Sequence, residues 1–136
     1  MKSFQASLAI AERLAGADKS NAEWQRDLSV SSIKVGDVLQ AQGNLPDALK
    51  SFQASLAIAE RLAGADPGNA EWQADLAASH GRIGQLFAHA GRTAEARAML
   101  MKGRAIVAPL AEKAPDVVLW QQYRDGFDRL LANLAT

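Results

Sequence analysis

The 136-residue chain contains no cysteine, only four prolines and no long hydrophobic run. The absence of cysteine excludes disulfides, thiol nucleophiles and cysteine-based zinc sites, and it suits the reducing environment of the cytoplasm, where we expect the protein to reside. The longest unbroken apolar stretch, residues 105–111, is far shorter than the roughly 20 residues that a membrane-spanning helix needs. We therefore expect a soluble protein with no membrane partner.

The chain also lacks an excess of charge of one sign. Fifteen Lys and Arg residues balance fifteen Asp and Glu residues, which leaves a formal net charge of zero. Because nucleic-acid binding depends on neutralising phosphates with basic residues, we expect no nucleic-acid partner. With 49% hydrophobic and 22% charged residues, the composition is that of a folded protein rather than a disordered one.

The most informative feature of the sequence is an internal repeat. Residues 2–18 read KSFQASLAIAERLAGAD, and residues 50–66, which lie 48 positions later, read the same. Residues 21–25 and 69–73 likewise share the letters NAEWQ, and the three tryptophans stand at positions 24, 72 and 120. Self-similarity at a fixed period is the signature of a repeat protein, in which each unit packs on its neighbours.

Each period contains two helical segments separated by turn residues. Apolar residues follow one helical stripe up to Gly43, and Pro46 stands where a second helix can begin. That helix is expected to end near residue 65, and Asn69 is expected to cap the next one. The second period has the same break at Gly91, and Pro109 is expected to kink its second helix or end it early. No segment alternates with strand periodicity, so we predict an all-α fold of about six antiparallel helices.

The expected domain organisation is a single array over residues 1–136. Residues 2–17 would be the second helix of a truncated repeat, residues 22–65 and 70–113 two full repeats, and residues 116–134 a half-repeat or capping helix with a more polar outer face. Since both ends resemble interrupted repeats, we expect the chain to be a fragment of a larger repeat protein.

The pattern of small and bulky residues within each period resembles the tetratricopeptide repeat. The matching positions are Gly36, Leu39, Gly43, Leu45, Ala48, Phe52, Ser55 and Leu56, then Gly84, Phe87, Gly91, Ala96, Leu100 and Gly103. The family's usual period is about 34 residues, so each helix here should be about two turns longer, as in long-period bacterial repeat proteins. The resemblance implies antiparallel hairpins stacked as a right-handed α-solenoid, in which small residues allow paired helices to approach closely.

The same resemblance implies a protein-interaction scaffold with a concave groove lined by the first helix of each repeat. This groove would hold a peptide or a partner helix. The charged and polar groove positions are Lys34, Asp37, Gln40, Arg82, Gln85 and His89, and the small or apolar ones are Val30, Ile33, Ala41, Ala78, Gly81 and Ala88. The alternative is that these positions are merely solvated. Among them, Lys34 and Arg82 are the expected principal polar contacts.

A different hypothesis makes the chain a structural module that assembles with copies of itself. The N-terminal helix has the sequence of an internal one, so its apolar residues should seek a partner. The residues expected to mediate this homo-oligomerisation are Phe4, Leu8, Ile10 and Leu14.

The sequence offers no catalytic constellation. Its two histidines, His80 and His89, are nine residues apart, which on a helix places them on opposite sides, so they cannot share a metal. No glycine-rich phosphate loop is present, and no serine has a base placed to activate it. We therefore expect no enzyme activity, no metal and no cofactor. The tryptophans are expected to pack in the core, and the glutamine that follows each one, at positions 25, 73 and 121, to form hydrogen bonds between repeats.

Overall fold

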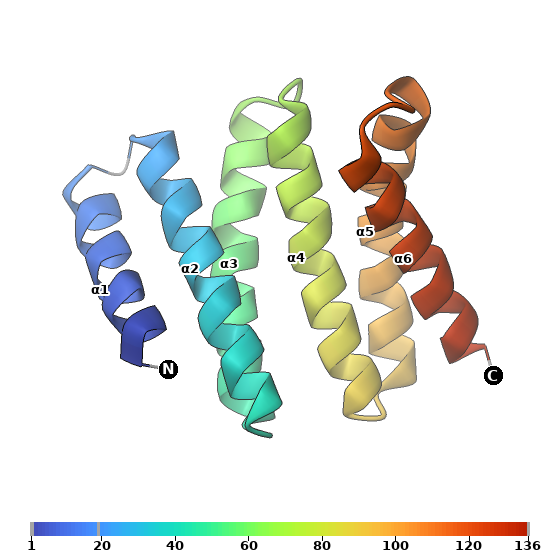
Figure 1. Ribbon diagram of the computed structural model, residues 1–136, viewed down its shortest axis with the longest axis horizontal. Helices are drawn as coiled ribbons and strands as arrows, with labels where there is room; N and C mark the ends of the chain where they lie inside the picture. Colours follow the sequence, from blue (N-terminus) through green and yellow to red (C-terminus); the bar gives the residue numbers. More distant parts are fainter. Residues whose placement is uncertain (1, 19, 136) are drawn as a thin grey trace. The chain divides into compact units, whose positions relative to one another are not determined.

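Six helices follow one another along the chain in the computed structural model (Figure 1). They are α1 (Lys2–Ala17), α2 (Ala22–Ala41), α3 (Leu45–Ala65), α4 (Ala70–His89), α5 (Thr93–Lys113) and α6 (Val118–Leu134). The structure describes residues 2–18 and 20–135, and the side chains of residues 2–5 lie outside this description. No strand occurs in these ranges, which confirms the predicted all-α fold with six helices.

Two asparagines begin the first helices of the two full repeats in the same way. The side-chain oxygen of Asn21 accepts a hydrogen bond from the backbone nitrogen of Trp24 at 3.1 Å, and Asn69 accepts one from Trp72 at 3.1 Å. Each bond satisfies an amide that would otherwise have no partner in the first helical turn. The predicted cap at Asn69 is confirmed, and Asn21 repeats it 48 residues earlier.

Glycine ends these two helices, as the sequence indicates. Gly43 has a φ of +81° and Gly91 a φ of +76°, a left-handed conformation in which a side chain would be strained. The expectation that Pro109 ends its helix early is wrong, because α5 continues to Lys113. Proline removes only one backbone donor, and the buried face of α5 on either side of it, at Val107 and Ala111, holds the segment in its packed position.

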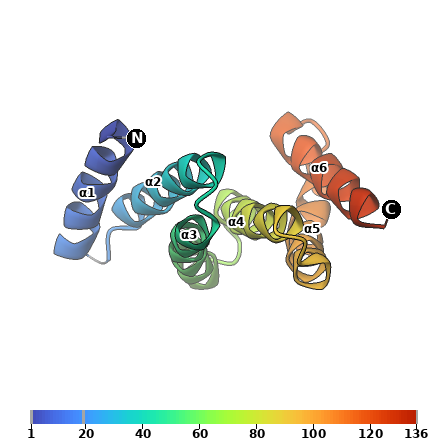
Figure 2. The same cartoon turned by 90° about the horizontal axis from the view of Figure 1, so that it is seen from below.

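The helices group into two compact units, Met1–Ala65 and Asp66–Thr136. In the first unit α2 contacts both α1 and α3, as Figure 2 also shows. In the second unit α5 contacts α4 and α6, and α4 also contacts α6. Each unit therefore contains one complete hairpin and one additional helix. The interpretation of residues 1–136 as a single array stays a prediction.

Small residues allow the close contact between α2 and α3 in the first unit. A Cβ atom added at Gly36 would lie 2.5 Å from the ring of Phe52, which is itself fully buried. Ser29 and Ser55 meet nearby, with their hydroxyl oxygens 2.7 Å apart. The predicted role of small residues is confirmed here, but the atoms that approach Gly36 belong to an aromatic side chain rather than to the opposing backbone.

The second unit is built around a cluster of buried residues from three helices, namely Ala77, Leu100, Val107 and Phe127. A Cβ atom at Gly84 would lie 2.7 Å from the side chain of Leu100. At Gly103 it would collide with the Phe127 ring and lie 3.0 Å from the carbonyl oxygen of Ala77. Half-buried residues of α6, including Trp120 and Tyr123, pack against the cluster. Glycine is thus required where α5 passes closest to α4 and α6.

Candidate partner-binding surfaces

The predicted binding residues of the first unit lie along one side of α2. Lys34 is exposed, whereas Asp37 and Gln40 are half-buried. Their spacing of three residues places them in successive turns on one side of the helix. Val30, one turn before Lys34, is 36% exposed. The surface therefore combines one accessible cation with two partly accessible polar groups and an accessible apolar residue.

The equivalent residues of the second unit lie on α4. Arg82 and His89 are exposed, and Gln85 is half-buried between them. His89 is the last residue of the helix. These three side chains also follow one side of their helix. All six residues thus lie on α2 or α4, and their role in binding stays a prediction.

Gly81 of α4, which the sequence assigns to the same surface, lies against α6. A Cβ atom at this position would lie 3.2 Å from the ring of Phe127, so α6 covers this part of α4. Gly81 is half-buried, and its assignment to a groove stays a prediction. The repeat pattern does not predict this contact, because the residues equivalent to Phe127 in the earlier copies are serines, Ser79 and Ser31.

The glutamines that follow the tryptophans tie helices together. The amide nitrogen of Gln25 donates to the carbonyl oxygen of Ala15 at 3.1 Å, which joins α2 to α1. The amide nitrogen of Gln121 donates in the same way to the carbonyl oxygen of Ala111 at 2.7 Å, which joins α6 to α5. Gln73 donates to the carbonyl oxygen of Pro67 at 3.3 Å. The predicted hydrogen bonds between repeats are confirmed for Gln25 and Gln121, which are therefore structural rather than available to a partner.

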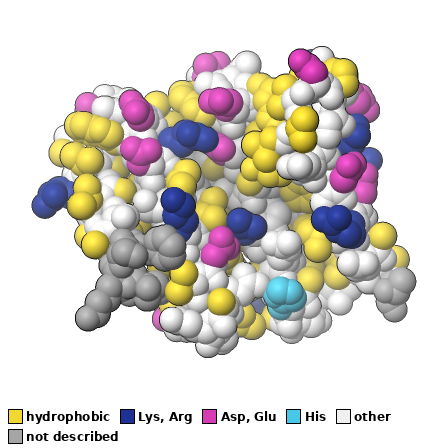
Figure 3. Space-filling model, viewed as in Figure 1, with side chains coloured by type: hydrophobic (Ala, Val, Ile, Leu, Met, Phe, Trp, Pro, Cys, Tyr) yellow, Lys and Arg dark blue, Asp and Glu magenta, His cyan; other side chains and the backbone are white. Residues whose placement is uncertain are grey.

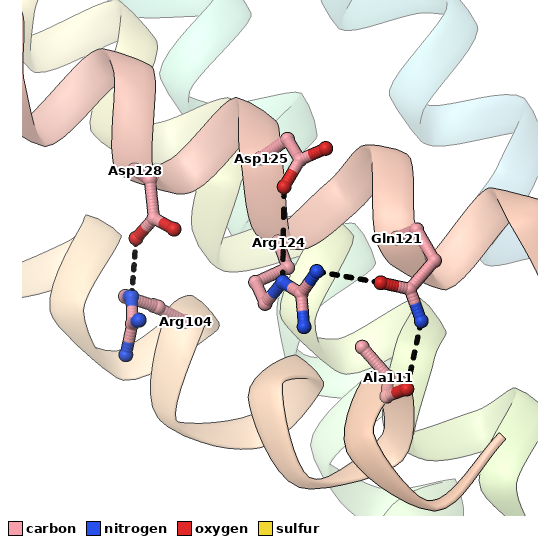
Figure 4. Close-up of polar contacts among 6 residues, drawn as sticks. All are labelled: Arg104, Ala111, Gln121, Arg124, Asp125 and Asp128. Atoms are coloured by element: carbon pink, nitrogen blue, oxygen red, sulfur yellow. Dashed lines mark hydrogen bonds and ion pairs between the residues drawn. The ribbon is translucent and has the colours of Figure 1, made fainter. Parts of the chain in front are cut away.

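The oxygen of this glutamine amide is satisfied differently in the two units. Gln25 accepts from the guanidinium of Arg61 on α3 at 2.9 Å, whereas Gln121 accepts from Arg124 on its own helix at 2.6 Å (Figure 4). Arg124 stands where the earlier copies have leucine. In the second unit the donor, Arg124, belongs to α6 itself, whereas in the first unit the donor, Arg61, comes from a different helix, α3.

Two aspartates of α6 also form ion pairs. Asp125 lies 3.7 Å from the guanidinium of Arg124, and Asp128 pairs with Arg104 of α5 (Figure 4). Asp125 and Asp128 are exposed, which agrees with the expected polar outer face of this helix. Tyr123, by contrast, faces the core cluster. The identification of α6 as a capping helix stays a prediction.

The predicted self-association residues lie on α1. The side chains of three of them are described, and two of these are exposed. Ile10 is 51% and Leu14 37% exposed, while Leu8 is half-buried. The side chain of Phe4 lies outside the described residues. A hollow of about 150 Å³ separates α1 from α2, and its lining residues are Ser7, Ile10, Ala11, Leu14, Trp24, Asp27 and Ser31. This surface is apolar apart from one carboxylate and two hydroxyl groups.

Charged side chains of both signs are scattered over the face seen in Figure 3. Hydrophobic side chains gather there over the first turns of α6, where Val118 is 64% and Leu119 50% exposed. The earlier repeats have Ala-Glu at the corresponding positions.

The two histidines differ in environment, as their spacing predicts. His80 is 8% exposed, whereas His89 is on the surface. Among the described residues, no group of three or more His, Cys, Asp or Glu side chains is arranged to hold a metal ion. Within the same residues, no helix combines the length and hydropathy that crossing a membrane requires.

Comparison with known proteins gives one result of functional value. The family model described as "Tetratricopeptide repeat" matches residues 27–108, which is more than half of the chain. No curated protein gives a significant match. No solved structure gives one either. The matched region begins within α2 and ends within α5, so it contains all six predicted polar binding residues.

Proposed function

We propose that this chain, which belongs to the tetratricopeptide repeat family, binds a peptide or a helix of a partner protein along the first helices of its repeats. The family mediates protein–protein interactions, generally as a non-enzymatic scaffold. The residues assigned to the partner are Lys34, Asp37 and Gln40 on α2 of the first unit and Arg82, Gln85 and His89 on α4 of the second unit. The observation that carries the proposal is that all six residues lie within the family match and are spaced by about one turn along their helices.

The chemistry of these residues favours a partner with acidic side chains. Lys34 and Arg82 are exposed cations, and charge-assisted hydrogen bonds to carboxylates are stronger than those between neutral groups. Gln40 and Gln85 carry amides that can donate to or accept from a peptide backbone. Because the chain has equal numbers of basic and acidic residues, we propose a protein rather than a nucleic acid as the partner.

Selection from a displayed random peptide library tests this assignment. We expect enriched peptides to contain acidic residues and to bind the purified chain saturably. Reversing both cations, by Lys34→Glu together with Arg82→Glu, should weaken binding of an enriched peptide at least about tenfold, while helicity by circular dichroism stays unchanged. The matched control reverses two exposed cations of second helices, Lys50→Glu and Arg97→Glu, and should leave the affinity unchanged. Equal weakening by both pairs, or no effect of either, would refute the assignment to α2 and α4.

A second candidate function is self-assembly through α1. The exposure of Ile10 and Leu14, together with the sequence expectation for Phe4 and Leu8, supports it. Light scattering over a range of protein concentrations separates the two candidates. A mass that rises with concentration, and that falls to the monomer value in Leu14→Glu, favours assembly, whereas a constant monomer mass excludes it.

Three further attributes complete the proposal. We infer that the chain is a long-period repeat of the kind found in bacterial proteins, that it forms part of a larger repeat protein, and that it functions in the cytoplasm. The 48-residue period and the absence of cysteine support these inferences. We assign no catalytic residue, metal or cofactor to it.

A further inference from the structure

Helix α6 begins 48 residues after α4, but it has a different residue at the position where a hairpin partner crosses. In α2 this position is Ser29, which is 6% exposed and bonds to Ser55 of α3 with the hydroxyl oxygens 2.7 Å apart. In α4 it is Ala77, which is fully buried and whose carbonyl oxygen would lie 3.0 Å from a Cβ atom at Gly103 of α5. In α6 it is Asp125, whose side chain is 69% exposed. A small residue that contacts the second helix of a hairpin is thus replaced by a carboxylate.

A second position on the same side of the helix changes as well. Seven residues after the first position, which is about two helical turns, α2 and α4 have Gly36 and Gly84. A Cβ atom would lie 2.5 Å from the ring of Phe52 at the first glycine and 2.7 Å from the side chain of Leu100 at the second. In α6 the equivalent residue is Ala132, which is exposed. Its methyl group occupies the space in which a partner helix would place its large apolar residue.

The opposite side of α6 is already packed within the second unit. Phe127 comes two residues after Asp125, which places it on the far side of the helix. It is 5% exposed and fills the space at Gly81 and Gly103, where an added Cβ atom would meet its ring. Since this contact fixes how α6 is rotated about its axis, the side with Asp125 and Ala132 faces outward.

Burial of Asp125 under a further helix would be unfavourable. Its carboxylate lies 3.7 Å from the guanidinium of Arg124, which also donates to Gln121 on its own helix. A carboxylate is buried at low cost only where it is both paired and hydrogen-bonded. The residues that face this position from second helices, Ser55 in α3 and Gly103 in α5, supply one hydroxyl group and none.

An apolar area remains at the first turn of α6. Val118 is 64% and Leu119 50% exposed. Both precede Asp125 by about two turns, so they lie outside the crossing point at which α2 and α4 have small residues. A segment that covers them need not pass over Asp125.

We propose that α6 ends the stack of hairpins, because its outward side does not accept a second helix of the α3 or α5 type. A segment that follows α6 in a longer protein therefore does not continue the array by the packing seen in this chain. The same side does not pair with α1 of a second copy, although α1 has the sequence of α3, so head-to-tail growth into an open filament is prevented. A polar outer face at a terminal repeat keeps such arrays soluble. This inference does not depend on the proposed function.

Extension of the full chain tests the proposal. A copy of residues 89–113 attached directly after Thr136 continues the 48-residue register and supplies a second helix with the sequence of α5. In the copy, the alanine that corresponds to the fully buried Ala96 is replaced by cysteine, which is unique because the chain has none. The rate of thiol labelling then reports whether the added helix packs. With wild-type α6 we expect labelling as fast as that of a short unstructured peptide with the same cysteine.

Restoring the residues of α4 should allow the added helix to pack. We expect Asp125→Ala together with Ala132→Gly to slow labelling at least about tenfold, because the cysteine is then buried against α6. Asp116→Ala with Ala98→Gly makes the same two chemical changes at exposed positions elsewhere and should have no effect. Circular dichroism of the unextended variants checks that they stay folded. Asp125→Ala alone, which keeps the helix-favouring Ala132, takes the place of the double variant where that variant loses helicity.

Ala96→Cys in α5 of an extended chain without the other cysteine is the reference for a packed helix, and it should be protected in every variant. Slow labelling of the added helix with wild-type α6 would overturn the proposal, since α6 would then accept a second helix. Fast labelling that persists in the folded Asp125→Ala variants would overturn it too, because these residues would not determine where the stack ends.

Discussion

Helices α1 and α3 have the same sequence and different surroundings. Comparing them separates the structure that the local sequence determines from the burial that depends on neighbouring helices. Both segments are helical, and both bury the same two alanines to within a few per cent exposure. Leu14 is nevertheless 37% exposed where Leu62 is 9% exposed. The sequence therefore determines the helix and which of its residues are apolar. Whether the isoleucine and the leucine are buried depends on which helix lies beside them.

The largest test of this difference truncates the same residue in both copies. Leu62→Ala should lower the free energy of unfolding by about 2–5 kcal/mol, the range for a buried leucine. Leu14→Ala should lower it by about 1 kcal/mol or less, since much of that side chain already contacts water. Urea denaturation followed by circular dichroism measures both values. Equal losses would show that the two helices have the same environment.

Three glycines test whether close packing is limited to the contact between α2 and α3. Gly36→Ala forces a methyl group against the buried ring of Phe52 and should destabilise the chain by about 1–3 kcal/mol. Gly16 has no neighbouring atom within 4 Å of an added Cβ, and the same holds for Gly64, its equivalent in α3. Alanine at either of these positions should stabilise the chain by up to about 1 kcal/mol, since alanine favours the helix. Thermal denaturation of the three variants gives the signs, and a stabilising Gly36→Ala would contradict the packing described here.

The helix caps provide a comparison in which the two copies should agree. Asn21 and Asn69 make the same 3.1 Å bond to the backbone of the tryptophan three residues later, and both are half-buried. Asn21→Ala and Asn69→Ala should each cost about 1 kcal/mol. Denaturant titration of the single variants checks this, with Asn21→Ser and Asn69→Ser as capping-competent controls. If the two alanine variants differ in their loss of unfolding free energy by more than about 1 kcal/mol, the two 48-residue units are not locally equivalent.

Features that repeat every 48 residues could be predicted from the sequence. The six helices, the cap at Asn69 and the turns at Gly43 and Gly91 follow from local chemistry, which does not depend on neighbouring helices. The bonds of Gln25 and Gln121 could be predicted in kind, because an amide packed between helices needs partners, and both amides donate to equivalent carbonyls, those of Ala15 and Ala111.

Features that depend on departures from the repeat could not be predicted. Phe127 covers Gly81, and Arg124 replaces the donor that Arg61 provides to Gln25. Their contacts depend on how α6 lies against α4 and α5, which the repeat pattern does not specify. Pro109 does not end α5, because the loss of one backbone hydrogen bond does not outweigh the packing of the helix on both sides of the proline.

Amide hydrogen exchange resolved by NMR tests the central claim most directly. Residues 6–17 and 54–65 have identical sequences, so their intrinsic exchange rates are closely matched and the ratio of observed rates reports the difference in local stability. The account predicts faster exchange in α1, whose only described neighbour is α2. Equal protection of the two segments in the free chain would contradict the claim that one side of α1 is open.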